Sequence, residues 1–211
     1  MALSKLAANS FDLTDNYAFT GTTTGVTSTQ KIFLIKNIDA SSDSNISFVN
    51  GSNSVVLDNT YKTYLFKFIN IHPSNDSQIF EFNGTTDGTN FNVTKTTTVF
   101  AANHDEADSE AAITYMGSYD NAQSTNFQDI QREVGNGNDE CFVAEMFLFN
   151  PSSTTFVKHF MARANTYRAN NQSEEFNVAG YFNTTSAITG IKFQFEGGTI
   201  DSGRIALYGI K

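Results

Sequence analysis

Short alternating apolar segments, separated by polar turns, are the feature that most restricts what this chain can fold into. In the clearest of them, Ile191, Phe193 and Phe195 alternate with Lys192 and Gln194. A period of two places one face of a β-strand in a core and the other face in water. Comparable segments recur roughly every 8 to 12 residues, which is the spacing of an all-β sandwich or barrel. We therefore expect an antiparallel β-sandwich.

The amino-acid composition favours the same fold class. The 211 residues contain 20 Phe, 8 Tyr, no Trp and only 2 Pro. Aromatic and β-branched side chains fit a pleated sheet, and the abundant Asn, Ser and Thr fit turns, so helix-rich folds are disfavoured. One large domain is the economical expectation for this length. We predict a β-sandwich over residues 31–211 and an extended N-terminal arm over residues 1–30, which is a candidate docking segment.

The alternation also predicts where individual strands lie. Asp87-Gly88 indicates a tight turn, so the segments on either side of it are expected to pair as a hairpin. The stretch from Asn103 to Arg132 is polar and irregular, with one helical turn expected near Asn126 to Arg132. Long excursions of this kind are often functional. Strands are predicted at Lys31–Ile38, Asn45–Val49, Ser54–Leu57, Tyr61–Ile71, Gln78–Phe82 and Phe91–Phe100, and in five further segments after Gly137.

Charge and cysteine content exclude several classes of function. The net charge of -9 and the scattered 13 Lys and Arg disfavour DNA, RNA and anionic membranes as partners. No apolar run approaches the roughly 18 residues of a membrane span, and the N-terminus lacks the apolar stretch of a secretory signal. The lone Cys141 cannot form an internal disulfide. We expect no nucleic-acid partner, no membrane span and no cofactor.

Catalytic motifs are missing from the sequence. No nucleophile elbow, zinc-binding helix or P-loop occurs, so we expect a protein that is not an enzyme. Glu174 and Glu175 could supply half of a glycosidase pair, but adjacent strand residues point to opposite faces. An acidic loop is the best metal-like group, because hard cations prefer several carboxylate oxygens. The alternative interpretation is that this acidic loop is simply solvated, and we expect no bound metal. The loop contains His104, Asp105, Glu106 and Asp108.

Three tyrosines near predicted loops are candidates for contacts with a glycan. Tyr115, Tyr119 and Tyr167 could stack on sugar rings and form a lectin-like site. The alternative is that each ring packs at the end of a strand and leaves its hydroxyl group in water. A glycan site would combine these rings with the excursion from Asn103 to Arg132.

Several longer strings of the sequence resemble one known family. They include YLFKFINIHPSNDS, KTTTVF followed by HDEADSE, LFNPSSTTFVKHF, VAGYFNTTSAITGIKFQF and the closing GTIDSGRIALYGIK. Together they are similar to virion structural proteins of tailed bacteriophages, especially the marine T-even-like myoviruses that infect cyanobacteria. The resemblance covers residues 11–211, and its most specific parts are Phe68 to Pro73, Phe149 to Phe160 and SGRIALYGIK.

This resemblance implies a location and a role, and it supplies no catalytic residue. It implies a non-enzymatic virion protein, displayed as a decoration or fibre-type protein on the head, neck or tail and assembled in the bacterial cytoplasm. The fold that it implies is a jelly-roll-like sandwich. The expected partners are other virion structural proteins and further copies of the chain, with a trimer favoured. The alternative function is a glycan-binding receptor module that recognises host surface polysaccharide.

Overall fold

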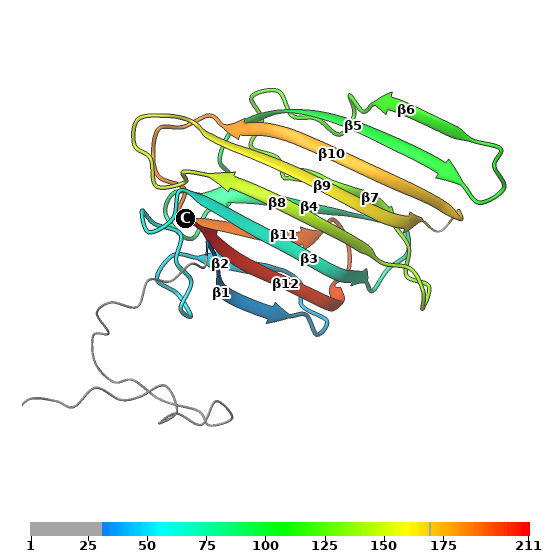
Figure 1. Cartoon of the computed structure of the whole chain (residues 1–211), viewed down its shortest axis with the longest axis horizontal. Helices are drawn as coiled ribbons and strands as arrows, with labels where there is room; N and C mark the ends of the chain where they lie inside the picture. The colour runs from blue at the N-terminus through cyan, green and yellow to red at the C-terminus, as the bar shows by residue number, and fades with distance from the viewer. Residues whose placement is uncertain (1–30, 169) are drawn as a thin grey trace, which may run out of the picture. The chain divides into compact units, whose positions relative to one another are not determined.

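The structure is a computed structural model that describes residues 31–168 and 170–211. The predicted docking arm over residues 1–30 lies outside the described residues. Every named element is a β-strand, and every strand pair is antiparallel, which confirms the predicted all-β class (Figure 1). Over the described ranges, no helix is long and apolar enough to span a membrane.

Ten of the twelve strands overlap predicted segments, and the other two, Ala111–Tyr115 and Gln128–Val134, begin in the stretch from Asn103 to Arg132 that is predicted to be irregular. They are β1 (Ile32–Asp39), β2 (Ile46–Val49), β3 (Thr63–Pro73), β4 (Gln78–Thr85), β5 (Lys95–Asp105), β6 (Ala111–Tyr115), β7 (Gln128–Val134), β8 (Phe142–Phe149), β9 (Lys158–Arg168), β10 (Gln172–Phe182), β11 (Gly190–Phe195) and β12 (Ile200–Ile210).

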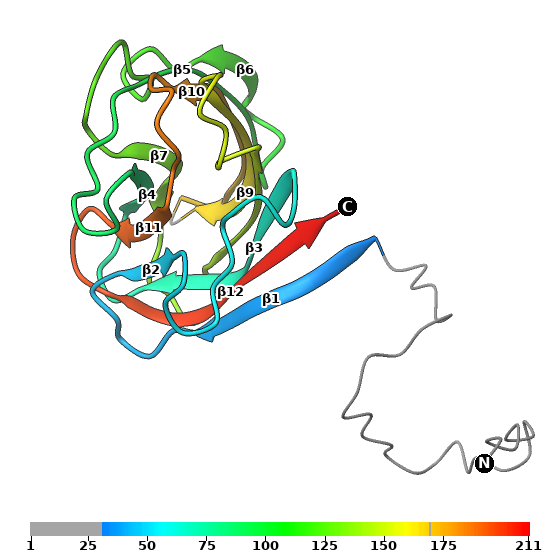
Figure 2. The ribbon, with the colours of Figure 1, turned by 90° about the vertical axis from the view of Figure 1, so that its left-hand side faces the viewer.

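The twelve strands form two layers. The larger layer has the order β1-β12-β3-β8-β9-β10-β5-β6, and the smaller has the order β7-β4-β11-β2. Figure 2 shows the larger sheet curving around the smaller one. A single residue pair, Val134 of β7 with Arg168 of β9, joins the two layers at one end. The result is a nearly closed antiparallel sandwich, as the alternation predicts.

Phenylalanine side chains fill the space between the two sheets. Phe193 on β11 is fully buried, and its ring centroid lies between 4.9 and 6.3 Å from those of five other rings. Its strand neighbours Lys192 and Gln194 are partly exposed on the other face, so the predicted alternation is confirmed. Three of these contacts, with Phe48, Phe66 and Phe68, are edge-to-face, a geometry that adds to the free energy gained from burial. The five rings around Phe193 belong to Phe48, Phe66, Phe68, Phe80 and Phe82.

Three local predictions are wrong. Residues 54–57 form no strand, although Val55 and Leu57 are buried, because a turn closed by the bond from Gly51 N to Val55 O directs them inward. The segments flanking Asp87-Gly88 do not pair as a hairpin, since β4 pairs with β7 and β11 while β5 pairs with β10 and β6. The helical turn expected near Asn126 to Arg132 is instead β7, which is held extended by pairing with β4.

Candidate functional site

An open groove of about 750 Å³ lies on the outer face of the smaller sheet. Its floor includes Glu81 of β4 and Asp129 of β7, which stand side by side in the strand register. The loop from Ser118 to Phe127 forms part of its wall, and Asp120 of this loop and Glu196 contribute two further carboxylates. The groove therefore combines aromatic rings, side-chain amides and acidic groups, which is a set of groups that can bind a polar, ring-shaped ligand.

The carboxylates in this groove disfavour one another's ionisation. Burial, together with the nearby charges of Glu81 and Glu196, raises the pKa of Asp129 to about 7. Burial also raises the pKa of Glu81. Gln194 Nε2 donates a hydrogen bond of 2.7 Å to Glu81 Oε1, which lowers this pKa, but the effect of burial is larger. Near neutral pH, Asp129 is thus partly protonated and can donate a hydrogen bond as well as accept one.

A buried amide fixes the loop that forms the wall of the groove. Gln128 Nε2 donates to the carbonyl of Tyr119 at 2.9 Å, and Gln128 Oε1 accepts from Asn121 Nδ2 at 2.9 Å. The same oxygen accepts from Thr97 Oγ1 at 2.6 Å. The ammonium group of Lys95 donates to the carbonyl of Asn126. Since these partners come from β5 and β7, the loop position is determined by both sheets.

The three candidate tyrosines have different surroundings. Tyr119 lines the groove, but its ring packs edge-on to Phe176 at 5.8 Å, and the guanidinium of Arg132 lies 5.3 Å from the ring centroid. Tyr115 is exposed on β6, and its hydroxyl donates to the Asp120 carboxylate. Tyr167 donates to Asn171 Oδ1 at 2.9 Å and does not line the groove. Only Tyr119 therefore belongs to the groove itself.

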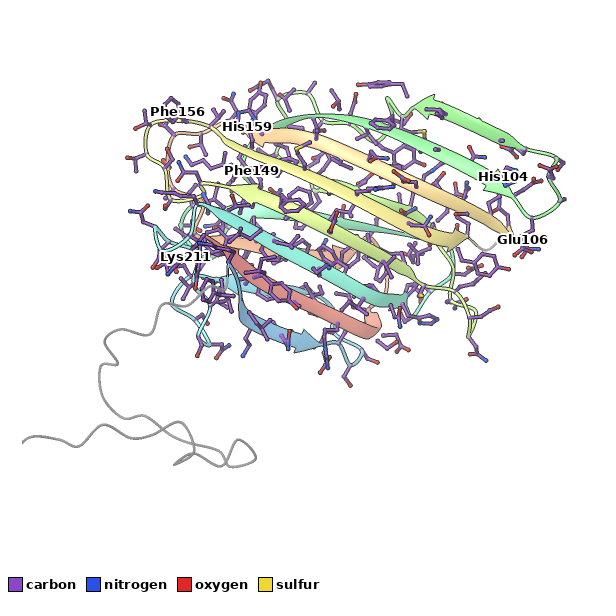
Figure 3. The ribbon with its side chains drawn as sticks, viewed as in Figure 1. His104, Glu106, Phe149, Phe156, His159 and Lys211 are labelled. Atoms are coloured by element: carbon purple, nitrogen blue, oxygen red, sulfur yellow. The ribbon has the colours of Figure 1, made fainter. Side chains whose placement is uncertain are left out.

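The acidic loop after β5 uses its side chains to close its own turn. The Asp105 carboxylate accepts hydrogen bonds from the backbone N–H groups of Ser109 at 2.8 Å and Glu110 at 2.9 Å. His104 Nε2 lies 3.1 Å from Asp108 Oδ1. Within residues 31–168 and 170–211, no three His, Cys, Asp or Glu side chains are arranged to hold a metal ion. Figure 3 shows His104 and Glu106 at one end of the large sheet, with Phe149 and His159 at the other.

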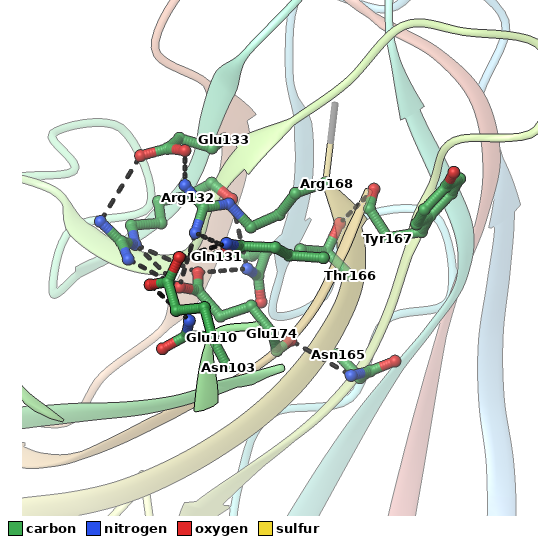
Figure 4. Close-up of polar contacts among 11 residues, drawn as sticks. Asn103, Glu110, Gln131, Arg132, Glu133, Asn165, Thr166, Tyr167, Arg168 and Glu174 are labelled. Carbon is green, nitrogen blue, oxygen red and sulfur yellow. Dashed lines mark hydrogen bonds and ion pairs between the residues drawn. The ribbon is translucent and has the colours of Figure 1, made fainter. Parts of the chain in front are cut away.

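A buried ion network connects the two sheets where β7 meets β9 (Figure 4). The Glu174 side chain on β10 is fully buried and accepts hydrogen bonds from two nitrogen atoms of Arg132, at 3.1 Å from Nε and 2.7 Å from Nη2. Arg168 Nη1 lies 3.3 Å from the same carboxylate, and Arg168 also pairs with Glu133. Burial lowers the pKa of Arg168. Each cation of this network has an acidic partner, as burial of charge demands.

Sequence reasoning missed this network because no motif marks it. One usable signal is present: Glu174 and Arg168 occupy positions that the alternation assigns to the inner face. A charge at an inner position needs a partner of opposite sign nearby. The prediction that Glu174 and Glu175 point to opposite faces is confirmed, since Glu175 pairs on the outside with Arg163 at 2.7 Å.

The outer face of the large sheet carries an apolar hollow of about 550 Å³. Phe147 of β8 stands beside Met161 of β9, which stands beside Ala179 of β10. Phe100 on β5 extends this apolar row toward the edge of the sheet, and Phe149 extends it along β8. These side chains face outward, away from the phenylalanine core.

No protein family, curated protein or solved structure matches the chain.

Proposed function

We propose that this chain is a non-enzymatic structural component of a bacteriophage virion, exposed on the head, neck or tail as a decoration or fibre-type protein. Its partners in this proposal are neighbouring virion structural proteins and further copies of the chain. The resemblance of residues 11–211 to virion proteins of tailed phages supports the location. The physical properties of the fold support the role.

The strand order supports a jelly-roll topology for the sandwich. When the hairpins β5–β6 and β9–β10 are set aside, eight strands remain, in the orders β1-β12-β3-β8 and β2-β11-β4-β7. In each sheet the strands alternate between the first and second halves of the chain. A long antiparallel hairpin wrapped into two sheets produces this order, and jelly rolls recur in capsid and lectin domains.

The observation that carries the proposal is the apolar outer face of the large sheet. Phe100 and Met161 are large apolar side chains that are about half exposed there, and Phe147 lies in the same hollow. A protein that works alone in water rarely presents contiguous apolar surface of this kind, whereas a subunit of an assembly does. We assign this face to contact with a neighbouring structural protein of the particle.

The test is incorporation into particles of the phage that encodes the chain. We expect immunogold labelling of intact virions and detection of the chain in purified particles by mass spectrometry. Met161→Glu should reduce incorporation, because it places a charge in the apolar hollow. Phe156→Glu, at a 69% exposed loop position outside that hollow, is the control and should leave incorporation unchanged. Virions without the chain would overturn the proposal.

The groove on the smaller sheet favours a second function, glycan binding. Its aromatic and acidic lining suits a polysaccharide with hydroxyl or amino substituents. Binding should appear on an array of host surface polysaccharides. Phe127→Ala should then weaken binding by about 1–3 kcal/mol per lost stacking contact, on the scale of bases stacked on aromatics. Phe156→Ala should not change it. A flat response from folded protein would remove this function.

A further inference from the structure

The strand β6 is an edge that nothing in the described part of the chain covers. It pairs with β5 along one side, and no strand of the described ranges pairs with its other side. All five of its residues are exposed, with Ile113 at 79% and Tyr115 at 60%. An exposed apolar edge of this kind is a template for pairing with another strand.

The edge strands β1 and β2 are protected, and β6 is not. A register shift between Leu34 and Lys36 interrupts β1, which also carries the charged pair Asp39–Arg204 at its end. The strand β2, at one edge of the smaller sheet, has only four residues. Bulges, charges and short length are the usual means of preventing edge pairing. The segment Ala111–Tyr115 has no charge, no proline, no glycine and no register shift.

The hydrogen-bonding direction of each β6 residue follows from its pairing with β5. Met116 N donates to Val99 O, and Asp105 N donates to Glu110 O, so even-numbered residues of this segment bond to β5. The N–H and C=O groups of Ala111, Ile113 and Tyr115 therefore point toward the free edge. Their side chains share the outer face with Phe100, which stands opposite Tyr115.

We propose that β6 pairs antiparallel with β6 of a second copy of this chain, about a two-fold axis through Ile113. In this register Ile113 faces Ile113, and Ala111 faces Tyr115 on both sides of the axis. All outward-pointing groups of the three residues are then satisfied, because each facing pair exchanges two backbone hydrogen bonds. The apolar row that contains Phe100 and Tyr115 becomes continuous across the two copies.

This arrangement explains why such a short, fully exposed strand carries isoleucine and tyrosine. A two-fold axis makes the segment its own complement, so the interface needs no other protein. It also closes the pairing at two copies, since β6 has only one free side. The pairing stands apart from the proposed virion role, because a particle protein can be incorporated with or without it.

The first experiment measures the mass of the full chain by light scattering after size exclusion. We expect twice 23.2 kDa for the native chain. Ile113→Lys places two ammonium groups opposite each other and should raise the dimer Kd by about tenfold or more. Val143→Lys is the matched control, because Val143 is also β-branched, apolar and exposed on the outer face but lies on β8. The Val143→Lys variant should remain dimeric. The circular dichroism of both variants should match that of the native chain, which shows that both are folded.

The second experiment traps the register with a disulfide. Facing residues of a hydrogen-bonded antiparallel pair lie about 5.5 Å apart at Cα, within the range that a disulfide spans. In a Cys141→Ser background, Ile113→Cys should form a covalent dimer on mild oxidation, and Val143→Cys should not. A native monomer or trimer, a dimer that persists in Ile113→Lys, or equal cross-linking of both cysteine variants would overturn the pairing. Virion incorporation of a monomeric chain would overturn the pairing and leave the proposed function standing.

Discussion

Replacement of Glu174 by glutamine tests whether the buried ion network holds the two sheets together. The substitution keeps the shape of the side chain and removes its charge, so Arg132 and Arg168 lose the carboxylate that they share. Removal of one partner from a buried ion pair costs about 3–5 kcal/mol, because the remaining charge stays buried. Glu133 still pairs with both arginines, so we expect the lower end, about 3 kcal/mol.

The adjacent residue provides a control with the same chemistry. Glu175 also binds an arginine through two hydrogen bonds, but Arg163 is 65% exposed. Exposed pairs contribute about 1 kcal/mol or less, so Glu175→Gln should change the free energy of unfolding by no more than that. Urea unfolding followed by circular dichroism measures both variants. Glu174→Gln should also lower Tm by about 10 °C. If Glu174→Gln and Glu175→Gln lower the free energy of unfolding by equal amounts, burial is not what makes the Glu174 ion pairs important.

Three further predictions concern the groove, the core and the backbone. Asp129→Asn should raise the free energy of unfolding at pH 8 by about 4 kcal/mol and leave it nearly unchanged at pH 3, as urea titrations would measure. The cause is that burial raises the pKa of Asp129 to about 7. Between about pH 4 and pH 7 the folded state keeps the proton on Asp129 and the unfolded state does not, so the free energy of unfolding falls as the pH rises through this range. Phe193→Ala should cost about 3–5 kcal/mol in the same assay, against less than about 0.5 kcal/mol for the exposed Phe156→Ala. Gly203→Ala should cost more than Gly51→Ala when Tm is measured, because both have positive φ but only at Gly203 would the new Cβ lie 2.5 Å from a backbone oxygen.

Local alternation predicted the strands that have one wet face and one buried face. The segment with Phe193 is the clearest example, because burial of one face of a strand requires an apolar side chain at every second residue. The same signal failed at Gln128–Val134, where a strand carries the sequence QDIQREV. Its inner positions hold Gln128 and Gln131, whose amides are buried in hydrogen bonds to other segments. Polar side chains whose hydrogen-bond partners lie far away along the chain look like loop residues in a sequence.

Pairing partners and the groove could not be predicted, because both depend on contacts between distant segments. The turn at Asp87-Gly88 is a strong local hairpin signal, yet the strands beside it belong to different sheets. Glu81 and Asp129 meet only because β4 pairs with β7. The sequence does indicate that the excursion after Asn103 is unusual, and its end forms a wall of the groove. It does not indicate which acidic groups that wall faces.

The candidate sites of this molecule depend largely on the two hairpins β5–β6 and β9–β10. The free edge is β6, the loop beside the groove connects β6 to β7, and Glu174 and Arg168 come from β10 and β9. Phe160 of β9 and Phe182 of β10 pack on Phe82 of β4 at one end of the hairpin β9–β10, so its other end, with Arg168 and Glu174, needs another source of stability. The ion network provides it by binding β9 and β10 to β7. Loss of Glu174 should therefore loosen the groove and the β6 edge together, while the phenylalanine core around Phe193 remains packed.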